Sequence, residues 1–146
     1  VHHSDTEMDI STAIRFHPIE IALSMALKIS LVYALGADPL SVLIFEILLN
    51  GSSIFNHANI NIPNRVDKIV RFLIVTPDMH RIHHSSQRTD HDKNFGFALS
   101  IWDHMFRTYK SRPERNHKEM EIGLNWQDEK PQELGWSLGL PFKKNG

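Results

Sequence analysis

The chain has 146 residues, 41% of them hydrophobic and 23% charged, which is typical of a folded domain and excludes disordered and fibrous sequences. Sixteen Lys and Arg residues oppose 17 Asp and Glu residues, so the formal net charge of −1 gives no overall attraction to nucleic acid. The sequence contains no cysteine, which excludes disulfide scaffolds, thiolate metal sites and cysteine nucleophiles. We expect residues 1–146 to form one domain.

The first residues, Val1-His2-His3, include no initiator methionine and no targeting segment, and we expect the chain to be part of a longer protein. Two mostly apolar stretches follow at 19–37 and 40–55, and Gly36-Ala37-Asp38-Pro39 between them is typical of a tight reversal. As helices they would be roughly 24–28 Å long at about 1.5 Å per residue. That length is slightly less than the thickness of a bilayer core of about 30 Å.

This apolar segment, 19–55, has two interpretations that hydropathy alone leaves open. It is either a transmembrane or re-entrant helix hairpin or a pair of core helices in a soluble domain. Glu20, Ser24 and Lys28 share one helical face and Glu46 lies in the second stretch. These groups would face the inside of a bundle, or Glu20 would lie at the headgroup level.

The segment after the hairpin is basic, with 11 Lys and Arg against 6 Asp and Glu between Asn61 and Lys118. In a membrane protein, this surplus places the segment on the cytoplasmic side, against anionic headgroups. A solvated basic surface explains the surplus equally well if no membrane is involved. No aromatic interleaving accompanies it, so we expect no nucleic-acid partner.

Helices are expected in the remainder of the chain, at 76–87 and after the turn Asn94-Phe95-Gly96. Thr76 is a suitable N-cap for the first, with Pro77 at its first position. The second carries Leu99, Trp102, Phe106 and Tyr109 at helical spacing. Residues 119–146 are expected to form an irregular polar tail. No strand signal is strong, so the predicted fold class is all-α.

Histidines are concentrated at positions that the predicted fold brings to one side of the hairpin. His80, His83 and His84 share one face of a helix, His2-His3 precedes the hairpin, and His57 follows it. Imidazoles that converge in this way bind transition metals such as Fe, Zn, Cu and Ni. We therefore predict a metal site in segment 56–118, completed by His2 and His3. The other histidines, His17, His91, His104 and His117, are predicted to lie outside it.

Metal-bound imidazoles usually donate their second N–H to a carboxylate or a carbonyl. Polar residues near the histidines are candidates for that role, although capping and turn formation explain each of them as well. These candidates are Asp78, Asp90, Asp92, Asn59 and Asn94, and Asp103 is a further one.

Four segments, HHSD…RFHPIE, FNHANI, HRIHHS and DKNFGFALSIWDHMFRTY, resemble the sterol desaturase/fatty acid hydroxylase superfamily, and bacterial sterol-desaturase-like members most closely. The resemblance implies a helical membrane protein with a histidine-rich cap on the cytoplasmic face that binds two iron ions. His2 and His3 match the end of the second histidine box of the family, and His80, His83 and His84 match its third box. His57 matches the additional histidine before that box. The first box has no counterpart in this chain, which as given is not expected to assemble the full site or to be active alone.

The resemblance also implies the chemistry. It predicts an O₂-dependent oxidoreductase that hydroxylates or desaturates an unactivated C–H bond of a fatty acyl or sterol-like lipid. Electrons would come from a separate ferredoxin, cytochrome b5-like protein or reductase, because the sequence carries no flavin, haem or nucleotide motif. We expect an integral protein of the bacterial inner membrane.

Two alternatives remain open. The same histidines are suitable ligands for Zn²⁺ in a membrane hydrolase that activates water. The second alternative is that the chain is a non-catalytic fragment with an incomplete metal site.

Overall fold

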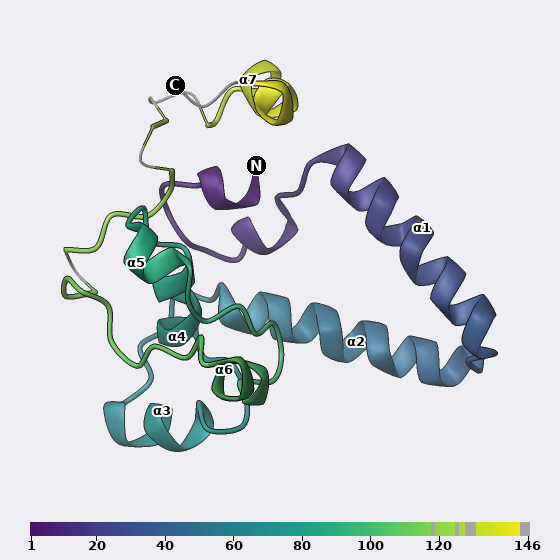
Figure 1. The fold of residues 1–146 in the computed structure, drawn as a ribbon, viewed down its shortest axis with the longest axis horizontal. Coiled ribbons are helices and arrows are strands. Elements are labelled where there is room, and N and C mark those ends of the chain that lie inside the picture. The colour runs from purple at the N-terminus through teal and green to yellow at the C-terminus, as the bar shows by residue number, and fades with distance from the viewer. Residues whose placement is uncertain (118, 125, 128–130, 144–146) are drawn as a thin grey trace.

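The computed structural model describes residues 1–117, 119–124, 126–127 and 131–143. Figure 1 shows two long helices that project together to one side, and short helices and loops that gather at their other end. The elements in chain order are η1 (His2–Ser4), η2 (Thr12–Ile14), α1 (Pro18–Leu35), α2 (Pro39–Asn56), α3 (Asn64–Val70), α4 (Pro77–His83), α5 (Arg88–His91), α6 (Ile101–Phe106), α7 (Leu134–Gly139) and η3 (Leu140–Phe142). The described residues form no strand beyond two isolated bridges, which confirms the all-α class.

The α1–α2 hairpin forms where the sequence predicted it, because local groups define its reversal. Gly36 ends α1 in the left-handed conformation at φ 61°, which glycine adopts without strain. Asp38 then caps α2 by accepting hydrogen bonds from the backbone N–H groups of Leu40, at 2.9 Å, and Ser41. Pro39 occupies the first helical position, where its missing N–H has no cost.

The hairpin exposes its apolar side chains, whereas a pair of core helices in a soluble domain would bury them. Helix α1 buries none of its residues, and α2 buries only Ser53 and Asn56. Both helices are long and apolar enough to cross a membrane. Because their apolar side chains face outward rather than into a protein core, the fold is that of a helical protein with two candidate membrane helices.

The charged groups within the hairpin face the gap between its helices. Lys28 Nζ of α1 lies 2.7 Å from Glu46 Oε1 of α2, and Asn50 donates to the Glu46 carboxylate at 3.3 Å. A cavity of about 420 Å³ opens between the helices next to this pair, and it extends to Glu20, Ser53 and Phe97. The face that carries Glu20 and Lys28 is therefore turned inward.

Helix α4 packs against the end of α2 and against α5. We call the short elements outside the hairpin the cap. Val75, Met79 and Ile82 are fully buried and form the apolar centre of the cap. The Thr76 hydroxyl accepts from the Met79 N–H, as expected for the predicted N-cap. Helix α4 ends at His83, earlier than the predicted position 87.

Two other segments differ from the sequence-based expectation. Helix α6 ends at Phe106 because Arg107 adopts a left-handed conformation at φ 60°, so Tyr109 lies beyond the helix. Its apolar side chains are exposed, although their helical spacing resembles that of a core helix. The segment expected to be an irregular tail includes α7 and η3, and Trp136 of α7 is buried.

Candidate metal centre

Four histidines from three separate elements direct the same ring nitrogen toward one point. His57 Nε2 lies 3.1 Å from His2 Nε2, 3.1 Å from His80 Nε2 and 3.3 Å from His84 Nε2. One ligand atom from each of these four side chains lies within 4.8 Å of the others. We call this group, His2, His57, His80 and His84, the histidine cluster.

His3 and His83 extend the cluster on one side. The ring of His3 lies 4.7 Å from that of His83 and 4.5 Å from that of His84, measured between centroids. The structure therefore brings all six predicted ligand histidines into one continuous group. The cluster forms its closest part, and the His3–His83 pair lies beside it.

Local structure explains why these side chains meet. Helix α4 presents His80 and His83, and its C-cap residue His84 follows directly, so the three are spaced over one helical turn. Thr76 and Pro77 determine where the helix starts. His57 ends α2 as its C-cap residue, directly beside α4. The short helix η1 supplies His2 and His3 from the beginning of the chain.

Backbone carbonyls determine which nitrogen of three rings is protonated. The Nδ1–H of His2 donates to Thr12 O at 2.8 Å, and that of His57 donates to Ser53 O at 2.7 Å. His83 Nδ1 lies 2.9 Å from Lys93 O and donates in the same way. With the proton on Nδ1, each Nε2 carries a free lone pair, as metal ligation requires.

The cluster stays uncharged at neutral pH, because burial disfavours protonated imidazole. Burial lowers the pKa of His2 to about 4 and that of His3 to about 3. It also lowers the pKa values of His57, His80, His83 and His84. Several lone pairs thus face one another at about the distance of a hydrogen bond, and a shared cation would relieve their mutual repulsion.

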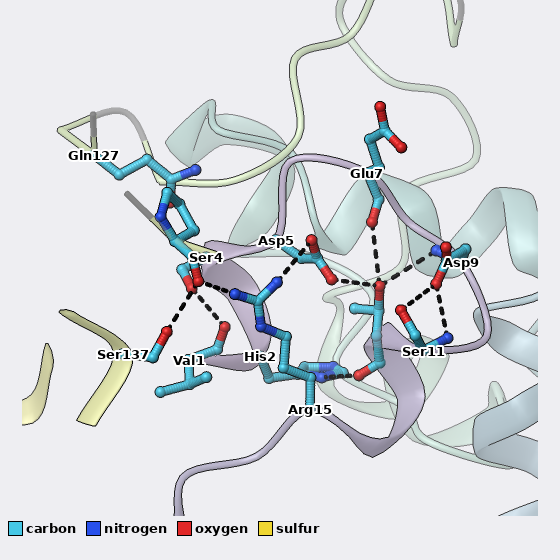
Figure 2. A network of polar contacts seen from close by, with 12 residues as sticks. Val1, His2, Ser4, Asp5, Glu7, Asp9, Ser11, Arg15, Gln127 and Ser137 are labelled. Atoms are coloured by element: carbon cyan, nitrogen blue, oxygen red, sulfur yellow. Dashed lines mark hydrogen bonds and ion pairs between the residues drawn. The ribbon is translucent and has the colours of Figure 1, made fainter. Parts of the chain in front are cut away.

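A network of polar contacts holds His2 in place (Figure 2). The Thr12 carbonyl accepts from His2, and the Thr12 hydroxyl donates to the Asp5 carboxylate at 2.8 Å. Asp5 in turn pairs with Arg15 at 3.0 Å, and Arg15 donates to the carbonyl of Pro131. The position of His2 therefore depends on contacts that extend to Pro131, far along the chain.

The loop from 94 to 103 supports His83. Asp103 is buried, and its carboxylate accepts from the N–H groups of Phe95 and Gly96, both at 2.8 Å. The Phe95 ring contacts the His83 ring at 5.3 Å between centroids. Only glycine fits at position 96, because an added Cβ would lie 2.6 Å from Asp103 Oδ2. The Asn-Phe-Gly turn and the aspartate of the following helix thus act together.

Five of the six residues predicted to support the histidines form other contacts. Asp90 is buried and pairs with Lys110 at 2.5 Å, and Asn94 bridges the backbone of Met79 and Lys110. The remaining three are Asp92, which pairs with Arg88 and His91, Asn59, which accepts from Arg81, and Asp78, which lines a polar cavity beside α3. Carbonyls of Thr12, Ser53 and Lys93 take the predicted role, and no side-chain pattern could have identified backbone acceptors.

Two further groups of the cluster lack such support within the described part of the chain. The Nδ1 atoms of His80 and His84 are buried and have no hydrogen-bond partner among the described residues.

The four other histidines of the sequence lie outside the cluster. His17 caps α1, His91 pairs with Asp92, His104 stacks on Tyr109, and His117 lines the polar cavity beside α3.

Comparison with known proteins identifies the family of the chain. The fatty acid hydroxylase family matches residues 1–108. The chain is 28% identical over 123 residues to the ornithine lipid hydroxylase OlsE of Rhizobium tropici, an alignment that covers 84% of this chain and 36% of that protein.

A second relative is the alkylglycerol monooxygenase of Homo sapiens. It is 26% identical over 119 residues, and the alignment covers 78% of this chain and 24% of that protein. The chain thus spans about a third and a quarter of the lengths of these two relatives. No solved structure matches it. Since the family match includes every histidine of the cluster and most of the chain, this protein belongs to the fatty acid hydroxylase family.

Proposed function

We propose that this chain provides metal ligands of an O₂-dependent di-iron enzyme that hydroxylates an unactivated C–H bond of a lipid. The ligands would be His2, His3, His57, His80, His83 and His84. The observation that carries the proposal is the convergence of four Nε2 atoms within 4.8 Å, from three elements that are far apart in the sequence.

The donor set fits iron. Neutral imidazole nitrogens are suitable ligands for iron, and three of the six rings have their lone pairs oriented by carbonyl hydrogen bonds. When bound, a pair of irons would supply the activation of O₂ that oxidation of an unactivated C–H bond requires. The buried rings of His57 and His84 keep water away from the centre of the cluster.

The lipid would reach the cluster from the hairpin. The cavity between α1 and α2 is lined by apolar side chains such as Met25 and Leu49, and it extends to Ser53. The Ser53 carbonyl holds His57, so an acyl chain in this cavity would lie beside the cluster. The names of both relatives favour hydroxylation over desaturation, since one is a lipid hydroxylase and the other a monooxygenase.

Electrons would come from a separate ferredoxin, cytochrome b5-like protein or reductase. The hairpin would anchor the chain in a bacterial inner membrane, and the cap would lie on the cytoplasmic side. The surplus of basic residues between 61 and 118 supports this orientation.

The test is metal analysis of the chain reconstituted in lipid nanodiscs with ferrous iron. We expect bound iron in the parent chain, near-complete loss of it in His80→Ala, and full retention in His104→Ala, whose exposed ring lies outside the cluster. Equal iron contents in the two variants would contradict the proposal.

Lipid extracts of cells that express the chain provide the second test. A hydroxylated lipid that depends on His80 supports oxygenase activity. Hydrolysis with bound zinc, in place of iron, would instead favour the membrane hydrolase. If the chain binds iron but forms no product, it holds a metal centre that is not catalytic by itself.

A further inference from the structure

A second apolar surface lies outside the hairpin, on the cap. The end of α3, the segment that follows it and helix α6 expose large side chains there, of which Ile69, Phe72 and Phe106 are 73%, 70% and 68% exposed. We call this surface the α6 face, and its residues are Ile69, Phe72, Leu73, Trp102, Met105 and Phe106. Such a concentration of exposed aromatic and aliphatic groups indicates a surface that contacts something other than water.

The α6 face is one ordered surface rather than two loose segments. Val75 N donates to Ala98 O at 3.0 Å, and Ser100 N donates to Leu73 O at 3.3 Å. The ring of Phe72 lies 6.4 Å from that of His104 in α6. The buried Asp103 carboxylate holds the loop that leads into α6. The backbone therefore keeps these apolar side chains together.

The α6 face is continuous with the hairpin. Figure 1 shows α3 and α6 on the side of α2 that faces away from α1. Asn56 at the end of α2 donates to Phe97 O at 2.5 Å, and Phe97 also borders the cavity between the hairpin helices. An apolar surface that adjoins two candidate membrane helices meets lipid at the same boundary.

Basic groups border the α6 face. Lys68 precedes Ile69 in α3, and Arg107 directly follows α6, and both side chains are exposed. Lysine and arginine beside aromatic side chains are typical of segments that lie at the membrane–water interface, where anionic headgroups attract them.

We propose that the α6 face lies in the interface of a bilayer that contains anionic lipid, beside the hairpin. The aromatic side chains would sit at the level of the headgroups and the upper acyl chains, and Lys68 and Arg107 would contact lipid phosphates. The cap would then be held by two contacts with the membrane, which define its tilt. This inference does not depend on any metal.

The absence of cysteine makes a direct test possible, because single-cysteine variants carry one spin label each. In nanodiscs with phosphatidylglycerol, we would compare collision of the label with oxygen, which is enriched in lipid, and with an aqueous nickel chelate. Phe106→Cys is the test position, Leu43→Cys within α2 is the lipid reference, and Thr89→Cys on α5 is the aqueous reference.

Phe142→Cys is the matched control, because Phe142 is also an exposed phenylalanine, at 75%, and belongs to η3, which contacts α7. Figure 1 shows α7 at the end of the molecule away from α3 and α6. We expect an oxygen-to-nickel ratio several-fold higher at 106 than at 89 or 142. A ratio at 106 equal to that at 89 would overturn the proposal. So would a label at 106 that neither reagent reaches, because that face would then be covered by protein.

A second measurement leaves α6 unchanged, so that a folding defect cannot mimic the result. In the double variant Trp126→Phe and Trp136→Phe, Trp102 is the only tryptophan of the chain. Brominated lipids should quench its fluorescence when the bromine is near the headgroup more strongly than when it is near the bilayer centre. No quenching at either depth would contradict an interfacial location.

Discussion

The hairpin and the cap place apolar and polar side chains in opposite ways. The hairpin exposes its apolar side chains and turns Lys28 and Glu46 toward each other. The cap buries histidine, aspartate and asparagine around a small apolar centre. Among the described residues, six buried side chains are hydrophobic and seventeen are polar or charged. The hairpin therefore requires an apolar environment around it, whereas the cap relies on hydrogen bonds among its buried polar groups.

Metal removal should distinguish the two regions most strongly. In the iron-loaded chain, we expect a chelator to speed amide exchange across α4 and the loop to 103 by at least about tenfold, because ligand binding stabilises the folded site. Exchange in α1 and α2 should not change. Hydrogen exchange with mass spectrometry measures both regions in one sample. Equal effects on hairpin and cap would show that the two are one cooperative unit.

Replacing one glycine in the cap and one in the hairpin by alanine tests the same contrast between the two regions. Gly96→Ala should destabilise the cap by about 2–3 kcal/mol, since the new Cβ would lie 2.6 Å from Asp103 Oδ2 and 2.8 Å from Leu99 O. In α2, Gly51 has nothing within 4 Å of the same position, so Gly51→Ala should stabilise the helix by about 0.5–1 kcal/mol. Thermal unfolding in detergent compares the pair, and the same sign for both changes would be unexpected.

Removal of one charge from the cap should have a slightly smaller effect. Asp103→Asn replaces a buried acceptor of three hydrogen bonds and should cost about 2 kcal/mol. Asp92→Asn, at an exposed pair with Arg88, should change stability by less than about 0.5 kcal/mol. Unfolding by urea measures both, and similar midpoints for the two variants would contradict the proposed role of Asp103.

Acid should also weaken the metal-free cap, because burial lowers the pKa values of its histidines. In the folded state the pKa of His2 is about 4 and that of His3 about 3, below the value of about 6.5 in an unfolded chain. The unfolded chain thus binds more protons as the pH falls below 6.5, and stability falls with it, down to the folded pKa values. These two histidines should contribute a loss of about 1.4 kcal/mol between pH 7 and pH 6. A melting temperature that rises over this interval would contradict the neutral cluster.

The sequence predicted the hairpin and the set of clustered histidines better than their surroundings. Gly36, Asp38 and Thr76 act on their nearest neighbours, so a short stretch of sequence is enough to place α2 and α4. In contrast, the carbonyls of Thr12 and Ser53 hold His2 and His57 through backbone atoms, which leave no trace in side-chain patterns.

The spacing of apolar residues also could not predict where α6 ends or whether its apolar side chains are buried. Trp102 and Phe106 recur as core residues do, yet both are exposed, because periodicity identifies an apolar face and not what covers it. The helix stops at Arg107 because the backbone turns there. This turn brings Thr108 O to the N–H of Asn94, and a contact between residues that far apart in the sequence is not visible in a local pattern.

The Lys28–Glu46 ion pair has a consequence for how the chain enters a membrane. Each of these charges is costly in hydrocarbon without its partner, and the partner is on the other helix. Neither α1 nor α2 is therefore suited to pass into lipid alone during synthesis. The two helices would leave the translocation machinery together, with Lys28 and Glu46 already paired.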